Sequence, residues 1–391
     1  MSSSSSSFAF ALAHAVFAFA LSCTRHDLST PAPESITTAD SGAASAPNAT
    51  SATGTTDALP LNRAALPLPA NVRFVGRVDR SNPNAVRFAW SGTEVVGRFQ
   101  GTSISARIRD DGTNFFEVLI DGEPKFVLQT QPNREIYSLA ESLPDAVHEI
   151  ALYKRTEARV GEAVFLGFEG SATMMPSLPP STRRIEFLGD SITTGYGNEG
   201  PGVDCTFNPA QQNEYITYGA ITARMLGAEH VTVAWSGKTI GEMTEYWERT
   251  LPARAESRWD HQSWVPQLVV LNVGTNDFAI RDPGEPRFVR MYIALFSRVR
   301  EAYPNALVVC ALGPMLSDAY PAGRRNRTLA KRYMQATMEK LKAAGQTHFE
   351  YLDFLEQRES DGLGCGYHPG RTTHALMAER LAAFVKERLG W

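Results

Sequence analysis

The sequence contains little sulfur and little concentrated positive charge. Cysteine occupies 4 of its 391 positions, and the formal net charge is -4. No basic cluster extends beyond the short run Arg324-Arg325-Asn326-Arg327, which argues against a surface that binds nucleic acid or anionic membranes. No spacing of His, Cys and acidic residues is typical of a metal site, and no glycine-rich loop precedes a phosphate-binding lysine. We therefore expect neither a metal nor another cofactor.

Long apolar runs are scarce too. The run from Phe8 to Leu21 is too short to span a bilayer comfortably, and its place is typical of the apolar part of a signal peptide, although no Lys or Arg precedes it. Leu21-Ser22-Cys23 resembles the lipobox of bacterial lipoproteins. We expect residues 1–23 to be an export signal, with the protein either secreted or tethered to the outer membrane or cell surface through a lipidated Cys23.

Residues 24–69 are mostly Ala, Ser, Thr, Pro and Gly, and large apolar side chains are almost absent before Leu59. Such a composition buries too little surface to offset the entropy lost on ordering, so a disordered linker is expected. With 43% hydrophobic positions, the chain as a whole can bury a sizeable core and is too long for one typical domain. Two folded domains are therefore predicted.

From about residue 70 to residue 170, short apolar-polar alternations are separated by turn signals such as Asp111-Gly112 and Asp121-Gly122. This pattern predicts an all-β sandwich. Trp90 and Phe116 are candidate platforms for sugar stacking, but aromatic residues in a core are several times commoner, so a structural or carbohydrate-contacting module is preferred. Examples of these alternating runs are Val86 to Trp90, Val95 to Phe99, Ser103 to Arg107, Phe115 to Ile120, Lys125 to Leu128 and His148 to Tyr153.

After a proline-rich hinge, Ser171 to Pro180, the pattern changes over residues 181–391 to apolar runs separated by helical stretches. This alternation implies a parallel five-stranded sheet covered by helices on both faces, with ligands bound beyond the carboxyl ends of its strands. The predicted strands are Ile185 to Leu188, Val231 to Ala234, Leu268 to Val273, Leu307 to Leu312 and Phe349 to Phe354. The predicted helices are Tyr215 to Leu226, Pro286 to Ala302, Arg327 to Ala344 and Thr372 to Leu389.

Residues suited to acyl transfer follow the predicted strands. Ser191 follows the first strand, Gly237 the second, Asn276 the third, and His368 precedes the last helix. Ser191 alone could be a helix N-cap, but with His368 it forms a nucleophile and a general base. The backbone N–H groups of Ser191 and Gly237, with the side-chain amide of Asn276, are the candidate oxyanion donors.

These blocks, Gly189-Asp190-Ser191, Gly237, Gly274-Thr275-Asn276-Asp277 and His368-Pro369, resemble those of the SGNH (GDSL-type) hydrolases. Further segments in both domains, including Phe116 to Gly122 and Lys154-Arg155-Thr156-Glu157, resemble carbohydrate esterase family 2. The resemblance implies a jelly-roll sandwich followed by an SGNH domain with a flavodoxin-like sheet. It also implies an acetyl xylan esterase-like activity that removes acetyl groups from plant polysaccharides such as xylan and glucomannan.

One departure from the SGNH pattern concerns the partner of the histidine. Most SGNH hydrolases have an aspartate three residues before the histidine, where this sequence has Cys365. The resemblance to members without the acid implies a Ser191-His368 dyad whose imidazole N–H is held by a backbone carbonyl. Asp361 is the alternative orienting residue. Without an adjacent carboxylate, the pKa of His368 is expected near the ordinary value of about 6.5.

The cysteines suggest one disulfide. Cys23 belongs to the signal, and Cys310 lies in an apolar run that is expected to be a buried strand. Cys205 follows the nucleophile and Cys365 precedes His368, so the contact between Ser191 and His368 brings their loops together. An exported protein is found where disulfides persist, so a Cys205–Cys365 bridge is predicted, with two separate thiols as the alternative.

The main functional hypothesis is an exported O-acetyl esterase, a monomer acting on acetylated polysaccharides or oligosaccharides and not on nucleic acid. One alternative is an SGNH esterase for lipids or small esters, which would call for a long apolar lid. The segment between Ser191 and Tyr218 is instead rich in Gly, Asn, Pro and Gln. The other alternative is a carbohydrate-binding protein with weak or no turnover.

Overall fold

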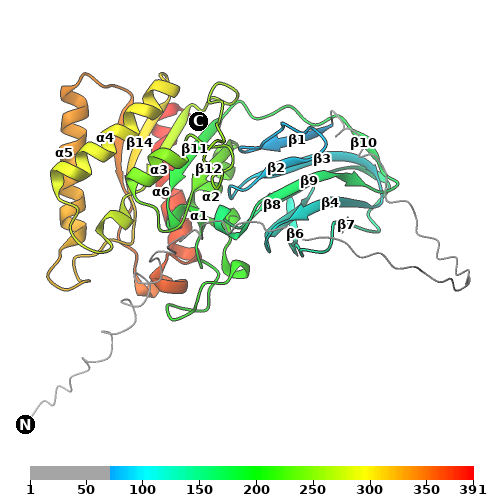
Figure 1. Ribbon diagram of the computed structural model, residues 1–391, viewed down its shortest axis with the longest axis horizontal. Coiled ribbons are helices and arrows are strands. Elements are labelled where there is room, and N and C mark those ends of the chain that lie inside the picture. The colour runs from blue at the N-terminus through cyan, green and yellow to red at the C-terminus, as the bar shows by residue number, and fades with distance from the viewer. Residues whose placement is uncertain (1–70) are drawn as a thin grey trace, which may run out of the picture. The chain divides into compact units, whose positions relative to one another are not determined.

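The computed structural model describes residues 71–391, so the predicted signal at residues 1–23, with Cys23, and the linker at 24–69 lie outside the described residues. The described residues belong to one compact unit. Figure 1 shows a region of β-strands, from β1 to β10, followed along the chain by a region in which strands and helices alternate. Among the described residues, no helix is long and apolar enough to cross a membrane.

The first region is a sandwich of two antiparallel sheets, as the period-two pattern predicts. In β4, Ile104, Ala106 and Ile108 point into the core while the residues between them do not. The larger sheet has the order β1-β3-β8-β5-β6, with β10 also paired to β3, and the smaller has the order β2-β9-β4-β7. The larger sheet contains β1 (Val72–Val75), β3 (Glu94–Gly101), β5 (Phe115–Ile120), β6 (Glu123–Gln129), β8 (Ala146–Lys154) and β10 (Thr173–Met175). The smaller contains β2 (Val86–Phe88), β4 (Ile104–Asp110), β7 (Ile136–Ala140) and β9 (Ala163–Glu169).

The two aromatic residues considered as sugar platforms are core residues. Trp90 and Phe116 are each 0% exposed, so neither ring can stack on a ligand. Phe116 packs edge-to-face on Phe88 within the sandwich, at a centroid distance of 6.2 Å. Trp90 belongs to the same apolar cluster as Ile240 and Met243, which come from the second region. The preference for core aromatics holds at both positions.

The second region is built on a parallel sheet with the order β12-β11-β13-β14-β15, which is the doubly wound, flavodoxin-like order and confirms the predicted fold class. Its strands β13 and β14 are buried along their whole length, as strands covered on both faces must be. The strands are β11 (Arg184–Gly189), β12 (Glu229–Ala234), β13 (Leu268–Asn272), β14 (Leu307–Leu312) and β15 (Phe349–Asp353). The helices are α1 (Ser191–Thr194), α2 (Tyr218–Leu226), α3 (Ile240–Tyr246), α4 (Glu285–Ala302), α5 (Asn326–Ala343) and α6 (Arg371–Leu389).

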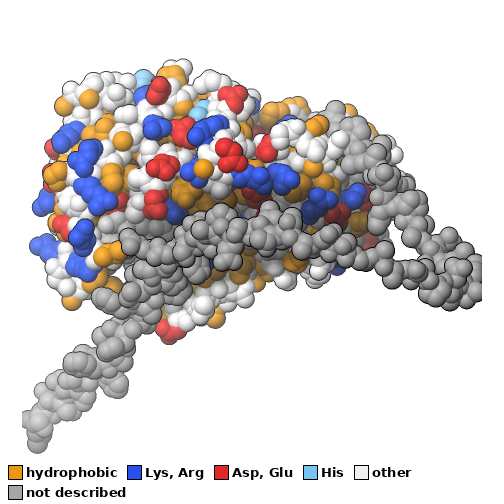
Figure 2. All heavy atoms as spheres, viewed as in Figure 1, with side chains coloured by type: hydrophobic (Ala, Val, Ile, Leu, Met, Phe, Trp, Pro, Cys, Tyr) orange, Lys and Arg blue, Asp and Glu red, His pale blue; other side chains and the backbone are white. Residues whose placement is uncertain are grey.

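The helices divide between the two faces of this sheet. Residues of α2 and α6 pack with Ile185 and Phe187 of β11, whereas residues of α3, α4 and α5 pack with Leu188 of the same strand. Alternate residues of β11 thus face opposite layers, which is the arrangement expected for a strand in the middle of a three-layer domain. On the face shown in Figure 2, acidic and basic side chains are interspersed.

The two regions share a buried polar boundary. Arg77, in the loop after β1, is 0% exposed and donates to the carboxylate of Glu186, a wholly buried residue of β11, at 3.2 Å. The Trp247 indole N–H donates to Oε1 of the Glu186 carboxylate. The Tyr303 hydroxyl donates to Oε2, the oxygen that also accepts from Arg77, at 3.2 Å. A charge from the sandwich is therefore neutralised inside the α/β region.

Candidate active site

The structure places Ser191 at the tight turn between β11 and α1. The Asp190 carboxylate caps this helix by accepting from the backbone N–H of Ile192 at 3.1 Å. Ser191 is the first helical residue, so its own N–H has no acceptor within the helix. The serine hydroxyl and this N–H lie at the carboxyl end of a central strand, where ligands of doubly wound sheets bind.

His368 lies against the serine and against a backbone carbonyl. Its Nε2 is 2.8 Å from the Ser191 hydroxyl oxygen, and its Nδ1 is 2.9 Å from the carbonyl oxygen of Cys365. A carbonyl only accepts, so Nδ1 carries the hydrogen and the neutral ring presents Nε2 as the acceptor for the serine proton. The Asp361 carboxylate instead contacts the neighbouring Ser360 hydroxyl, at 3.5 Å. The structure thus contains a dyad oriented by the main chain.

Burial changes the titration of this histidine. Loss of hydration lowers the pKa of His368 to about 4, against the opposing effect of the Cys365 and Gly366 backbone. The sequence-based expectation of about 6.5 considered only neighbouring carboxylates and is wrong in this respect, because a charged imidazolium is poorly hydrated here. The Tyr196 ring, with its centroid 4.4 Å from that of His368, covers part of the ring.

The candidate oxyanion donors meet at the turn that follows β12. Lys238 N–H closes this turn onto the Trp235 carbonyl at 3.3 Å, and Gly237 has a φ of 81°, which a side chain would strain. Asn276 Nδ2 donates to the Lys238 carbonyl at 3.0 Å, so one amide hydrogen binds the turn and the other remains for a substrate. Within the described residues, the Gly237 N–H donates to no protein acceptor. Both donors are therefore present and linked to each other.

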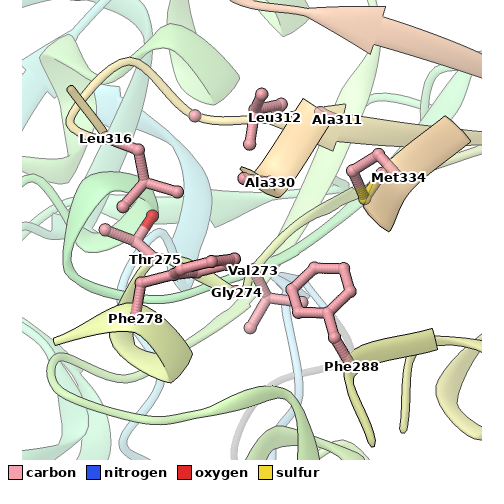
Figure 3. A pocket seen from close by; sticks show the side chains of 11 residues that line it. Val273, Gly274, Thr275, Phe278, Phe288, Ala311, Leu312, Leu316, Ala330 and Met334 are labelled. Carbon is pink, nitrogen blue, oxygen red and sulfur yellow. The ribbon is translucent and has the colours of Figure 1, made fainter. Parts of the chain in front are cut away.

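The loop that carries Asn276 rests on apolar side chains. Figure 3 shows Phe278, Phe288 and Met334 around a cavity of about 10 Å³ beneath Gly274 and Thr275. This volume would hold one water molecule and is too small for a sugar. Asp277 fixes the same loop from another side, because its carboxylate accepts from the Ile240 N–H at 3.0 Å. The cavity is thus a packing feature of the loop and not the substrate site.

Two family models match this chain: "Carbohydrate esterase 2 N-terminal" over residues 74–180 and "GDSL-like Lipase/Acylhydrolase family" over residues 187–376. The solved structure of a family two carbohydrate esterase from Clostridium thermocellum, in complex with cellohexaose, is 38% identical, with a TM-score of 0.78. The match covers 82% of this chain and 99% of that chain. The chain belongs to carbohydrate esterase family 2.

Two curated relatives have names that describe an activity. Cellulase/esterase CelE of Acetivibrio thermocellus is 39% identical over 332 residues, which cover 82% of this chain but 40% of that protein. The chain therefore spans less than half the length of CelE. An acetylxylan esterase / glucomannan deacetylase of Cellvibrio japonicus is 26% identical, and the match covers 83% of this chain and 92% of that protein.

The predicted disulfide of this family 2 chain is present. Cys205 and Cys365 are joined with a Cα–Cα distance of 4.9 Å, and Cys310 is a buried free thiol in β14. The bridge packs tightly on the loop after the nucleophile, because a Cβ on Gly200 would clash with the Cys365 sulfur. The residue whose carbonyl holds His368 is thus itself covalently attached to the nucleophile loop.

Two further residues of the family 2 site were not predicted from the sequence. The Tyr196 ring contacts the His368 ring at a tilt of 38° and stacks on the Phe207 ring at a centroid distance of 4.6 Å. Glu157, from the sandwich, accepts from the backbone N–H of Ser236 at 2.7 Å, directly before Gly237. The only signal for Glu157 was its place in the segment Lys154-Arg155-Thr156-Glu157, which resembles the family but carries no role of its own.

Proposed function

We propose that this protein is an exported carbohydrate O-acetyl esterase that removes acetyl groups from plant polysaccharides through an acetyl-serine intermediate. The observation that carries the proposal is the position of His368, with Nε2 2.8 Å from the Ser191 hydroxyl and Nδ1 2.9 Å from the Cys365 carbonyl. This geometry pairs a nucleophile with an oriented neutral base. The Gly237 N–H lies on the turn after β12, and the Asn276 amide, from the loop after β13, donates to the same turn at Lys238.

In the first half-reaction the Ser191 oxygen attacks the acetyl carbonyl carbon while His368 Nε2 takes the serine proton. The carbonyl oxygen becomes an oxyanion, held by the N–H groups of Ser191 and Gly237 and by the Asn276 amide. The tetrahedral intermediate then breaks its bond to the sugar oxygen. That oxygen leaves as a hydroxyl with the proton from His368, and the acetyl group stays on Ser191.

In the second half-reaction water replaces the sugar. His368 removes a proton from the water, whose oxygen attacks the acetyl carbon, and a second oxyanion forms at the same donors. Ser191 leaves with the proton from His368, and acetate is released. During both steps the dipole of the Cys365 carbonyl stabilises the transient imidazolium. In a Ser-His-Asp triad an aspartate stabilises the imidazolium with a full negative charge.

The choice of substrate rests on the family and on the polarity of the loops. The curated relatives are named for acetylxylan, glucomannan and cellulase/esterase activities, and one relative was solved with cellohexaose. The loop after Ser191 is rich in Gly, Asn, Pro and Gln, which suits a polar polymer better than a lipid. Export, as a secreted protein or as a lipoprotein through Cys23, rests on the sequence of residues 1–23.

Acetate release from acetylated xylan, acetylated glucomannan, an acetylated chitooligosaccharide and triacylglycerol tests the proposal. We expect release from the first two, and none from any substrate with Ser191→Ala. Preference for triacylglycerol would instead indicate a lipid esterase. Binding to the polysaccharides without any release would indicate a carbohydrate-binding protein that no longer turns over.

A further inference from the structure

We propose that Glu157 is a positioning residue that the sandwich contributes to the oxyanion hole. This inference rests on the proposed function, because an oxyanion hole affects the reaction only if Ser191 forms a tetrahedral intermediate. Glu157 is 0% exposed, and its Oε2 accepts from the backbone N–H of Ser236 at 2.7 Å. The Ser236 N–H belongs to the Trp235–Ser236 peptide, so this bond fixes the chain one peptide before the one that presents the Gly237 N–H to the substrate.

The turn is held at Ser236 from two directions. Glu157 binds its N–H, and its hydroxyl lies 3.2 Å from the Thr194 hydroxyl, which belongs to the nucleophile helix α1. Thr194 Oγ1 in turn donates to the Ser191 carbonyl at 3.1 Å. The position of the Gly237 N–H relative to Ser191 therefore depends on a chain of contacts that ends on a sandwich residue.

Glu157 is itself held rigidly. The buried Lys154 Nζ donates to the Thr156 carbonyl at 2.7 Å and to the Glu157 carbonyl at 3.4 Å, and these bonds close the segment after β8. The Glu157 N–H donates to the Gln212 side chain at 3.1 Å, and Gln212 donates to the Thr194 carbonyl at 3.2 Å. The backbone of Glu157 is therefore fixed at both its N–H and its carbonyl, and its fully buried side chain extends from this fixed point to the Ser236 N–H.

The role of Glu157 is geometric and not electrostatic. A negative charge beside the oxyanion hole opposes the charge that develops on the substrate oxygen, so the charge by itself would slow the reaction. Arg159 offsets part of it, with its Nε 3.8 Å from Glu157 Oε1. What the site needs is the acceptor for the Ser236 N–H. Glutamine supplies an acceptor of the same reach, whereas methionine has the same length and offers no comparable acceptor.

The test compares Glu157→Gln with Glu157→Met, using p-nitrophenyl acetate and acetylated xylan as substrates. We expect Glu157→Gln to keep kcat within about 3-fold, and Glu157→Met to lower kcat by about 10- to 100-fold with little change in KM. The loss should be smaller than the roughly 100- to 1000-fold that follows removal of a whole donor. Affinity for phenylboronic acid, which forms a tetrahedral adduct with serine, should fall with kcat.

Glu162→Met is the matched control. Glu162 lies in the same domain and binds Arg254 across the same boundary with two contacts of 2.8 Å, but it does not touch the turn at Ser236. Its loss should leave kcat and boronate affinity unchanged. Glu157→Asp, which keeps the charge and is one methylene too short, should show the same kcat loss as Glu157→Met, and it serves if Glu157→Met does not fold.

Unchanged kcat and boronate affinity in Glu157→Met and Glu157→Asp would overturn the role of Glu157. A loss in Glu157→Gln equal to that in Glu157→Met would show that the charge and not the acceptor matters, and would overturn it too. Absence of wild-type turnover on both substrates would refute the proposed function itself. The two failures are therefore distinguishable.

Discussion

At the scale of single residues, the site replaces an acid with a carbonyl. Most of the SGNH pattern is present, yet His368 binds the Cys365 carbonyl at Nδ1, where most SGNH hydrolases use an aspartate. A dipole stabilises the imidazolium less than a carboxylate does, and burial disfavours the charged ring further, lowering its pKa to about 4. The histidine is thus ready as a neutral base well below neutral pH.

The pH dependence of turnover follows from this pKa. Activity needs neutral His368, so kcat/KM should rise with pH as the ring loses its proton. Because burial lowers the pKa of His368 to about 4, we expect the midpoint to lie well below the ordinary value of about 6.5. Measuring kcat/KM for p-nitrophenyl acetate from about pH 4 to the ordinary value of about 6.5 and above locates this midpoint. A midpoint above the ordinary value would mean that a carboxylate reaches the ring.

Substitutions at the dyad separate it from a triad. Ser191→Ala and His368→Ala should each abolish acetate release, and the double variant should be no worse, because both residues serve one proton transfer. Asp361→Asn should be nearly silent, since this carboxylate contacts Ser360 and not the imidazole. Circular dichroism verifies that the variants fold. A loss in Asp361→Asn comparable with that in His368→Ala would make Asp361 the orienting residue.

At the scale of elements, the sequence predicts the α/β sheet better than the sandwich. Each of the five parallel strands is rich in apolar residues, although Glu186, Thr232 and Glu350 interrupt three of them, and the structure places their ends within two residues of the prediction. In the sandwich, β9 was missed because Ala163, Val164 and Phe165 are consecutive buried residues, which breaks the alternation. The pairing of β4 with β9 also shifts register between Arg107 and Ile108, and no short-range pattern marks such a bulge.

The catalytic and oxyanion-hole residues of the α/β domain were predicted from the sequence, whereas the site residue contributed by the sandwich was not. Ser191, Gly237 and Asn276 each follow a parallel strand, so the topology alone brings them to one edge. Glu157 follows a strand of the other domain, and its partner Ser236 lies 79 positions further along the chain. Only the packing of the two domains brings this pair together. The start of α2 was placed three residues early because Glu214–Ile216 forms a separate 3-10 turn, after which Thr217, with extended backbone, caps α2.

The loop before His368 is held by the Cys205–Cys365 disulfide and by backbone hydrogen bonds. Cys365 N–H donates to the Gly197 carbonyl at 3.0 Å and Gly366 N–H to the Val203 carbonyl at 2.9 Å, so two backbone bonds support the bridge. Cys205→Ser removes the bridge without altering Cys365. Its cross-link closes a separation of 160 residues, so the free energy of unfolding should fall by about 2–5 kcal/mol.

Turnover should fall along with stability, though the backbone bonds limit the loss. A shift of about 1 Å in a reacting group can cost on the order of 100-fold, so we expect kcat to drop about 10-fold in Cys205→Ser. Urea unfolding and p-nitrophenyl acetate kinetics measure the two effects, and the same protein treated with a thiol reductant is the control. Peptide mapping that finds both thiols free in the native protein would show that the disulfide does not form. An unaltered kcat in Cys205→Ser would show that the disulfide has no catalytic role.

At the scale of the whole molecule, the two domains behave as one structural unit. From the sandwich, Arg77 binds Glu186 inside the α/β core, and Glu157 binds the N–H of Ser236 in the turn before Gly237. Arg155 adds a third contact by pairing with both Glu117 of its own domain and Glu199 of the nucleophile loop. A boundary that contains buried pairs of opposite charge cannot open without separating those charges. We therefore expect a single unfolding transition and not two.

Arg77 provides the sharpest test of this coupling. Its side chain and that of Glu186 are both 0% exposed, so Arg77→Met leaves a buried carboxylate without its cation and should lower the free energy of unfolding by about 3–5 kcal/mol. Arg77→Met/Glu186→Met should recover part of this loss, because the unpaired charge is gone, although Trp247 and Tyr303 lose their acceptor. Arg388→Met, which breaks an exposed pair with Glu350, should cost no more than about 1 kcal/mol. Urea unfolding at one pH compares all three variants, and an Arg77→Met loss no larger than that of Arg388→Met would mean that the boundary does not couple the domains.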